Sequence, residues 1–68
     1  MTPAELGTIV REARRAAGLT QQQLAAAAAV GVRFVIELEA GKPTAQLGKT
    51  LAVLAMLRCQ VRIDPRPW

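Results

Sequence analysis

The sequence predicts an all-α domain, a bundle of four to five helices with a short strand near its C-terminal end. Two observations support this expectation. Apolar residues recur at helical spacing in stretches bounded by Thr, Pro and Gly, whereas an alternation of apolar and polar residues appears in residues 58–64. The 68 residues leave room for one small domain. We therefore expect a helical domain over residues 1–57 and a dimerising strand with a C-terminal tail over residues 58–68.

The composition favours a binding protein over an enzyme. The net charge of +4 and the pI near 10.7 favour a polyanionic partner, although the basic residues are scattered. The sequence has no His and no Gly-rich phosphate loop, and its five acidic residues show no catalytic spacing. We expect no enzymatic activity, no metal site and no cofactor. A single cysteine, no signal-peptide pattern and no long apolar stretch predict a cytoplasmic protein without a membrane segment.

The first helix is expected to begin at Pro3, after the capping residue Thr2, and to end at Gly18. Its predicted buried stripe consists of residues that share one helical face: Leu6, Ile9, Val10, Ala13 and Ala17. Arg11 and Arg15 fall on other faces, so we expect both to be solvated.

Two short helices joined by a tight turn are predicted in the centre of the chain. Thr20 is a good N-cap, and Gln23, three residues later, completes a capping-box pattern. A run of alanines continues this helix until Val30-Gly31 breaks it. The next helix covers about residues 32–40, and Gly41 is placed to end it. Two helices with such a turn form a helix-turn-helix unit, whose second helix can enter the major groove of DNA.

One face of the helix at residues 32–40 is the predicted DNA-contacting face. At about 100° per residue, Val35 and Leu38 point inward with Phe34 beside them. The opposite face carries Val32, Arg33, Ile36, Glu37 and Ala40. Arginine can pair with guanine, glutamate can accept from cytosine, and apolar side chains can contact thymine methyls. The alternatives are an ion pair between Arg33 and Glu37 within the helix, and burial of Val32 and Ile36 against the preceding helix.

The last helix is expected to begin at Thr44 and to run to about Leu57, with two apolar stripes. We assign Leu47, Leu51 and Leu54 to the core, which leaves Val53, Met56 and Leu57 for another surface. The following strand has no partner segment in its own chain, so pairing with a second copy across a two-fold axis is the economical solution. The predicted dimer interface comprises Val53, Met56, Leu57, Cys59, Val61 and Ile63. The alternative is a frayed tail.

Several segments resemble the Cro/C1-type (XRE) helix-turn-helix family. They are Leu19-Thr20-Gln21, Leu24-Ala25, Val30 and Leu38-Glu39-Ala40-Gly41-Lys42, with residues 6–18 similar to the first helix of the family. Residues 43–57 and the tail resemble its HipB-like antitoxin branch, which dimerises through a pair of strands. The resemblance covers about residues 4–63 and implies a lambda-repressor-like bundle. Two positions depart from the pattern: Ala29 replaces the usual turn glycine, and Gly31 replaces a frequent capping serine.

The resemblance also implies roles for individual residues. Gln21 matches a glutamine that contacts a DNA phosphate, and Lys42 follows the helix end as a natural phosphate contact. The alternative for each is a solvated surface residue without a ligand. Arg14 and Glu39 match a pair that ties the first helix to the end of the third. The predicted DNA-binding set is therefore Gln21, Val32, Arg33, Ile36, Glu37 and Lys42.

Together these observations suggest a sequence-specific repressor that binds a palindromic operator in double-stranded DNA as a homodimer. The HipB-like resemblance further implies a bacterial antitoxin, associated with the nucleoid through DNA, that binds a HipA-like kinase toxin and represses its own operon. Trp68, behind two prolines, is a candidate toxin-binding residue; a disordered end or one folded back on the dimer is the alternative. The rival functions are a plain phage-type or metabolic repressor and a protein-interaction module that no longer binds DNA.

Overall fold

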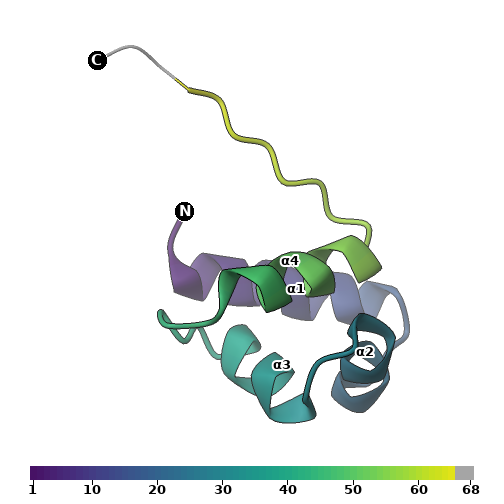
Figure 1. Cartoon of the computed structure of the whole chain (residues 1–68). Helices are drawn as coiled ribbons and strands as arrows, with labels where there is room; N and C mark the ends of the chain where they lie inside the picture. Colours follow the sequence, from purple (N-terminus) through teal and green to yellow (C-terminus); the bar gives the residue numbers. More distant parts are fainter. Residues whose placement is uncertain (66–68) are drawn as a thin grey trace.

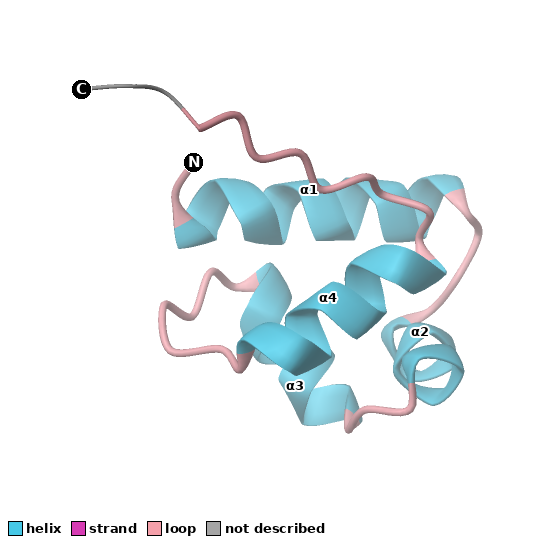
Figure 2. Cartoon of the chain, turned by 45° about the horizontal axis from the view of Figure 1, so that its top comes forward, coloured by secondary structure: helices cyan, strands magenta, loops and turns pink. Residues whose placement is uncertain are grey.

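Four helices form a bundle in the computed structural model, which describes residues 1–65 (Figure 1). The helices are α1 (Pro3–Ala16), α2 (Gln21–Ala28), α3 (Val32–Glu39) and α4 (Leu47–Met56). Helix α3 packs against both α1 and α2, and α4 packs against α2. Figure 2 shows helices and loops but no strand within residues 1–65. The all-α prediction is therefore confirmed, with four helices in the described chain.

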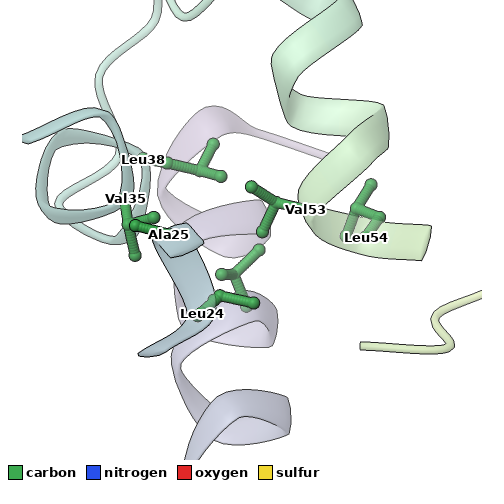
Figure 3. Packing of buried hydrophobic residues seen from close by; sticks show 7 residues of the cluster. Leu24, Ala25, Val35, Leu38, Val53 and Leu54 are labelled. Atoms are coloured by element: carbon green, nitrogen blue, oxygen red, sulfur yellow. The ribbon is translucent and has the colours of Figure 1, made fainter. Parts of the chain in front are cut away.

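All four helices contribute to one small hydrophobic core. Its buried residues are Val10, Leu24, Ala25, Val35, Leu38, Val53 and Leu54 (Figure 3). The stripe predicted for α1 is only partly buried: Val10 is fully enclosed, whereas Ile9 is exposed. Val35 and Leu38 point inward from α3 as expected, with Phe34 packed at the edge of the core. The inner face of α3 is thus fixed by packing, which leaves its other face for solvent.

The helix starts follow the capping residues that the sequence indicates. The hydroxyl oxygen of Thr2 accepts a hydrogen bond from the Glu5 N–H at 3.1 Å. In α2, the hydroxyl oxygen of Thr20 accepts from the Gln23 N–H at 3.0 Å, and the Gln23 side chain accepts from the Thr20 N–H at 2.9 Å. This reciprocal pair satisfies two backbone donors that a helix start leaves without intrahelical partners. The capping box predicted from the sequence is confirmed.

All four helices end in the same way, with one residue in the left-handed region and two backbone hydrogen bonds that close the last turn. The left-handed residues are Gly18, Ala29, Gly41 and Arg58. The residue after each donates its N–H to a carbonyl five positions back, in the pairs Leu19–Arg14, Val30–Ala25, Lys42–Glu37 and Cys59–Leu54. Ala29 therefore adopts the conformation of the turn glycine that it replaces, at φ +56°. Gly31 instead has extended backbone at the start of α3.

Two glycines allow α1 to approach α3 closely. A Cβ on Gly7 would lie 2.6 Å from the backbone oxygens of both Leu38 and Glu39. A Cβ on Gly41 would lie 2.9 Å from the Cα of Ala4. The sequence indicates Gly41 as a helix end, and the structure adds this second, steric reason for it. The contact places the C-terminal end of α3 directly against α1.

Helix α4 begins later than the sequence predicts. The expected start at Thr44 lies in the turn between α3 and α4, and the helix begins at Leu47, with Gln46 at the N-cap position. The Gln46 side chain makes no capping hydrogen bond. Ala45 packs against the core, so the chain must cross from α3 to α4 before it can turn into a helix.

The face of α4 that enters the core also differs from the prediction. Thr50, Val53 and Leu54 are buried, whereas Leu47 is 71% exposed and Leu51 is 43% exposed. Thr50 can face the core because its hydroxyl donates to the Gln46 carbonyl at 2.8 Å, which removes the cost of an unpaired polar group. Counting apolar residues alone misses such a position. Val53, predicted at a dimer interface, is fully buried within its own chain, and that prediction is wrong.

Residues 59–65 follow α4 as an extended segment that forms no strand (Figure 1). A strand needs a backbone partner, and none of residues 1–65 provides one. The predicted interface residues separate into two groups: Leu57 and Cys59 are half-buried against the core, whereas Met56, Val61 and Ile63 are exposed. Trp68, the candidate toxin-binding residue, lies outside the described residues.

Candidate nucleic-acid interface

The outer face of α3 is open to solvent on the side of the bundle opposite the C-terminal segment (Figure 1). Val32 and Ile36 are 37% and 46% exposed, so neither is buried against α2. Two exposed apolar side chains on a short amphipathic helix offer contacts of the kind that thymine methyl groups make. The face of α3 that the sequence predicts to contact DNA is thus the face exposed in the structure.

Three charged side chains on this side form a chain of ion pairs. Glu37 accepts from the Arg33 Nε at 3.1 Å through one carboxylate oxygen and from the Lys42 ammonium through the other. These hydrogen bonds, that from Lys42 first and that from Arg33 second, lower the pKa of Glu37. The ion pair between Arg33 and Glu37 that competes with DNA contact is therefore present in the free protein. The Arg33 side chain is still 91% exposed, so it can reach a ligand after a local rearrangement.

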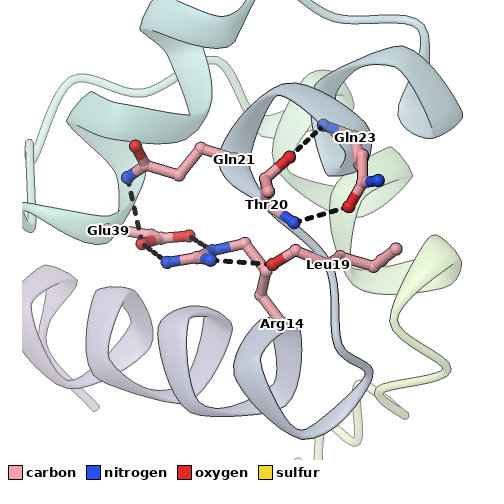
Figure 4. Close-up of polar contacts among 6 residues, drawn as sticks. All are labelled: Arg14, Leu19, Thr20, Gln21, Gln23 and Glu39. Atoms are coloured by element: carbon pink, nitrogen blue, oxygen red, sulfur yellow. Dashed lines mark hydrogen bonds and ion pairs between the residues drawn. The ribbon is translucent and has the colours of Figure 1, made fainter.

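A second glutamate two residues along α3 lies in a different environment (Figure 4). Arg14 donates to Glu39 through Nε at 2.6 Å and through Nη2 at 3.1 Å, while Nη1 donates to the Leu19 carbonyl at 2.9 Å. Both side chains are largely buried, and the bond to Glu39 raises the pKa of Arg14. The predicted pair of Arg14 and Glu39 thus forms in the structure and joins α1, the following loop and the end of α3.

Gln21 occupies the first turn of α2, where the resemblance places a phosphate contact. Its side-chain amide donates to Glu39 at 3.3 Å, which holds the half-buried side chain against the end of α3 (Figure 4). An amide group carries two N–H donors, so this bond leaves one for another acceptor. The partially positive N-terminal end of the helix favours an anion at this position.

The structure places two further arginines, Arg11 and Arg15, beside the predicted DNA-binding residues. The sequence predicts only that both are solvated. Arg11 and Arg15 border a cleft of about 420 Å³ that we call the α1 cleft. Its lining is Arg11, Arg14, Arg15, Gln21, Ile36, Glu39 and Ala40. The only signal in the sequence is their spacing of four residues, which places both on one side of α1. Their proximity to Gln21 and Ile36 depends on how α1 crosses α3, and no local pattern predicts that crossing.

Other features of residues 1–65 bear on function classes. No three His, Cys, Asp or Glu side chains in this part of the chain lie together as potential metal ligands. In the same residues, every helix is too short or too polar to cross a membrane. Lys49 lies over the ring of Phe34, with its Nζ 5.8 Å from the ring centroid, near the Lys42 end of the outer face.

Comparison with known proteins places this fold in a family. Residues 10–61 match the family model described as helix-turn-helix. The chain belongs to this helix-turn-helix family, of the Cro/C1 (XRE) type. It is also 53% identical over 62 residues to a protein of Sinorhizobium fredii (strain NBRC 101917 / NGR234) named uncharacterized HTH-type transcriptional regulator y4mF. That match covers 91% of this chain and 82% of its relative.

Proposed function

We propose that this protein is a transcriptional repressor that binds an operator in double-stranded DNA through the outer face of α3. The observation that supports this most strongly is the combination of family membership with an exposed recognition face. Val32 and Ile36 offer apolar contacts, Arg33 offers base or phosphate contacts, and Lys42 lies where a phosphate can be reached. The bacterial relative named as a transcriptional regulator agrees with this role.

A gel-shift titration on the promoter of its own gene tests this function. Wild-type protein should bind the promoter duplex more tightly than a scrambled duplex of equal length. Replacing Arg33 with alanine should cost about 1–3 kcal/mol on the promoter and relax the preference at one symmetric base position. Lys42→Ala should weaken binding to all sequences alike. Equal binding of wild-type protein to both duplexes would contradict sequence-specific repression.

We also propose that the repressor acts as a homodimer. Five large apolar side chains of α4 and the following segment are exposed in the single chain: Leu47, Leu51, Met56, Val61 and Ile63. Exposed apolar residues on neighbouring elements favour a protein interface. Pairing of residues 58–64 with the same residues of a second copy would give each segment its missing strand partner. Two copies of α3 would then read a palindrome about one helical turn, roughly 34–36 Å, apart.

Sedimentation measures this assembly directly. Wild-type protein should sediment as a dimer at micromolar concentration, and a chain truncated after Leu57 should shift toward monomer. Val53→Ala serves as a contrasting variant, because its side chain is in the core: it should lower stability without specifically opening the dimer. A monomeric wild-type protein would rule out the two-fold arrangement, and an unchanged dimer after truncation would show that α4 alone holds it.

We further propose that the protein is the antitoxin of a HipA-like kinase and represses their shared operon. The support is the resemblance of residues 43–57 and the C-terminal segment to the HipB-like branch. Helix α3 and the C-terminal segment lie on opposite sides of the bundle (Figure 1). One dimer would therefore offer separate surfaces for DNA and a kinase. Co-expression with a HipA-like kinase should restore growth and yield a stable complex. Growth arrest that persists, with no complex formed, would favour the plain repressor without a toxin.

One observation favours a second function, a protein-interaction module that no longer binds DNA. Glu37 pairs with both cations of the outer face in the free protein, and Val32 and Ile36 leave that face partly apolar. Such a surface is also compatible with a protein partner. Failure of the wild-type protein to bind any duplex at low salt would support this alternative over repression.

A further inference from the structure

We propose that the α1 cleft binds a phosphate of the DNA backbone, with Arg11 and Arg15 as the cations that hold it. This inference rests on the proposed function, because it assigns a second contact region to the same DNA-binding side. It adds two residues of α1 to a surface that the sequence locates only on α2, α3 and Lys42. The expected ligand is a phosphodiester group of double-stranded DNA.

The position of the cleft supports this ligand. Its walls include Ile36 and Ala40 from the outer face of α3 and Gln21 from the first turn of α2. A duplex that places α3 in its major groove therefore brings a sugar–phosphate backbone alongside these residues. Contacts to phosphates make up half or more of the hydrogen bonds between proteins and DNA, and they set the orientation of the protein.

The charges of the cleft also favour an anion. Arg14 is engaged by Glu39 and by the Leu19 carbonyl, so its guanidinium is already satisfied. Arg11 and Arg15 are exposed and form no ion pair with any of residues 1–65. Two like charges one helical turn apart repel each other, and an anion between them relieves that repulsion. A guanidinium also matches the geometry of a phosphate through paired hydrogen bonds.

The start of α2, whose first residue Gln21 lines the cleft, has backbone N–H groups without partners in the described chain. The capping box satisfies the N–H groups of Thr20 and Gln23. The N–H groups of Gln21 and Gln22 make no hydrogen bond within residues 1–65. Free N–H groups at the N-terminus of a helix bind phosphate well. The cleft is therefore lined both by cations of α1 and by Gln21 at the N-terminal end of α2.

The charges of a neighbouring hollow favour one side of the arginines for the phosphate. This hollow, of about 320 Å³, is lined by Thr8, Arg11, Glu12, Arg15 and Glu39. Its two carboxylates balance its two arginines, so it offers no net attraction to an anion. The α1 cleft has three arginines against a single carboxylate. The phosphate is therefore expected on the Gln21 side of Arg11 and Arg15.

The salt dependence of DNA binding tests the proposal without knowledge of the operator. The probe is a 20-base-pair duplex of random sequence, titrated with full-length protein across a range of salt concentrations. Arg11→Gln/Arg15→Gln is compared with Ala26→Glu/Ala27→Glu, which lowers the net charge by the same two units at exposed positions of α2 outside the cleft. Each neutralised phosphate contributes about 0.9 to the slope of log affinity against log salt. The cleft of each chain holds one phosphate, so the cleft variant should lose roughly 0.9 from that slope for each bound chain, or about 1.8 for a dimer. It should bind about 10- to 100-fold more weakly at 0.1 M salt.

The control variant should retain most of the wild-type slope and affinity. Circular dichroism should show equal helicity for all three proteins, because each substituted residue is exposed. If the wild-type protein binds the duplex but the two variants have equal slopes, the α1 cleft holds no phosphate and the proposed function stands. If the wild-type protein binds no duplex, the proposed function itself fails.

Discussion

The two glutamates of α3, Glu37 and Glu39, are two residues apart in the sequence, yet they do different work. Glu39 lies on the inner side, where Arg14 and Gln21 bind it among largely buried groups. Glu37 lies on the outer side, where Arg33 and Lys42 bind it beside exposed surface. We infer from this difference that burial, rather than the presence of an ion pair, decides whether a charged residue supports the fold or modulates DNA binding. A buried pair cannot be broken without cost, whereas an exposed pair exchanges readily with other ligands.

The largest expected effect is the loss of stability when the buried ion pair of Arg14 and Glu39 is broken. Glu39→Gln should lower the free energy of unfolding by about 3–5 kcal/mol, because Arg14 then keeps a buried charge without a carboxylate. In a domain this small, such a loss lowers the midpoint of thermal unfolding by roughly 12 °C or more. Thermal and urea unfolding followed by circular dichroism provide the measurement.

The double variant Arg14→Met/Glu39→Leu is the matched control for this prediction. It removes both charges together and should recover part of the lost stability, because no unpaired charge remains. A double variant that is as unstable as the sum of its single variants would show that the two residues act independently.

The next largest effect is on DNA affinity when the exposed ion pairs of Glu37 with Arg33 and Lys42 are broken. Glu37→Gln frees Arg33 and Lys42 and removes a negative charge that, in the proposed complex, would lie near the phosphates. We expect several-fold tighter binding to random-sequence DNA and little change in unfolding. Glu5→Gln, in the first turn of α1, removes the same net charge but belongs to no ion pair of the outer face, so it should change affinity much less. Equal gains from both variants would mean that net charge, and not this contact, controls the affinity.

A smaller effect on stability is expected at the turn that orients α3. Ala29 has a left-handed conformation, which costs an alanine about 1–2 kcal/mol relative to glycine. Ala29→Gly should therefore raise the free energy of unfolding by roughly 0.5–1 kcal/mol, after the entropy that glycine adds to the unfolded chain. DNA affinity should stay unchanged, because the variant touches neither glutamate. A destabilised variant would mean that the Ala29 side chain makes a contact outweighing its backbone strain.

The smallest effect is the dependence of stability on pH. The pKa of Glu37 is lowered from its ordinary value of 4.5, so its ion pairs contribute stability above about pH 4.5. That contribution is lost as the pH falls through the lowered pKa of the folded state. The stability of the wild-type protein should therefore decline more steeply below pH 4.5 than that of Glu37→Gln. Parallel profiles of the two proteins would show that the exposed pairs contribute nothing to folding.

The sequence predicts what depends on local pattern and misses what depends on the packing of distant elements. The capping box at Thr20 and the inward face of α3 follow from residue type and spacing, and both occur in the structure. The prediction for the inward face of α4 was wrong. Thr50 is buried there in place of an apolar residue, because its hydroxyl donates a hydrogen bond to the Gln46 carbonyl. The α1 cleft was not foreseen, because it depends on the close crossing of α1 and α3 at Gly7.

The residues in the left-handed region show the same limit of the sequence at the helix ends. Gly18 and Gly41 mark their helix ends in the sequence, whereas Ala29 and Arg58 adopt the same conformation without glycine. Their backbones are held there by the hydrogen bonds that close α2 and α4. Residue type alone therefore identifies two of these four turns, and the hydrogen-bond pattern is needed to identify the others.

Backbone amide NMR of the uniformly labelled wild-type protein, titrated with a duplex of its own promoter, tests the central claim most directly. That claim is that the outer side of α3 binds DNA while the inner side holds the fold. The account predicts the largest shift changes at Val32, Arg33 and Ile36, with further changes at Gln21 and Arg15, and small ones at Val35 and Leu38. Changes confined to α4 and residues 59–65, with α3 unaffected, would contradict it.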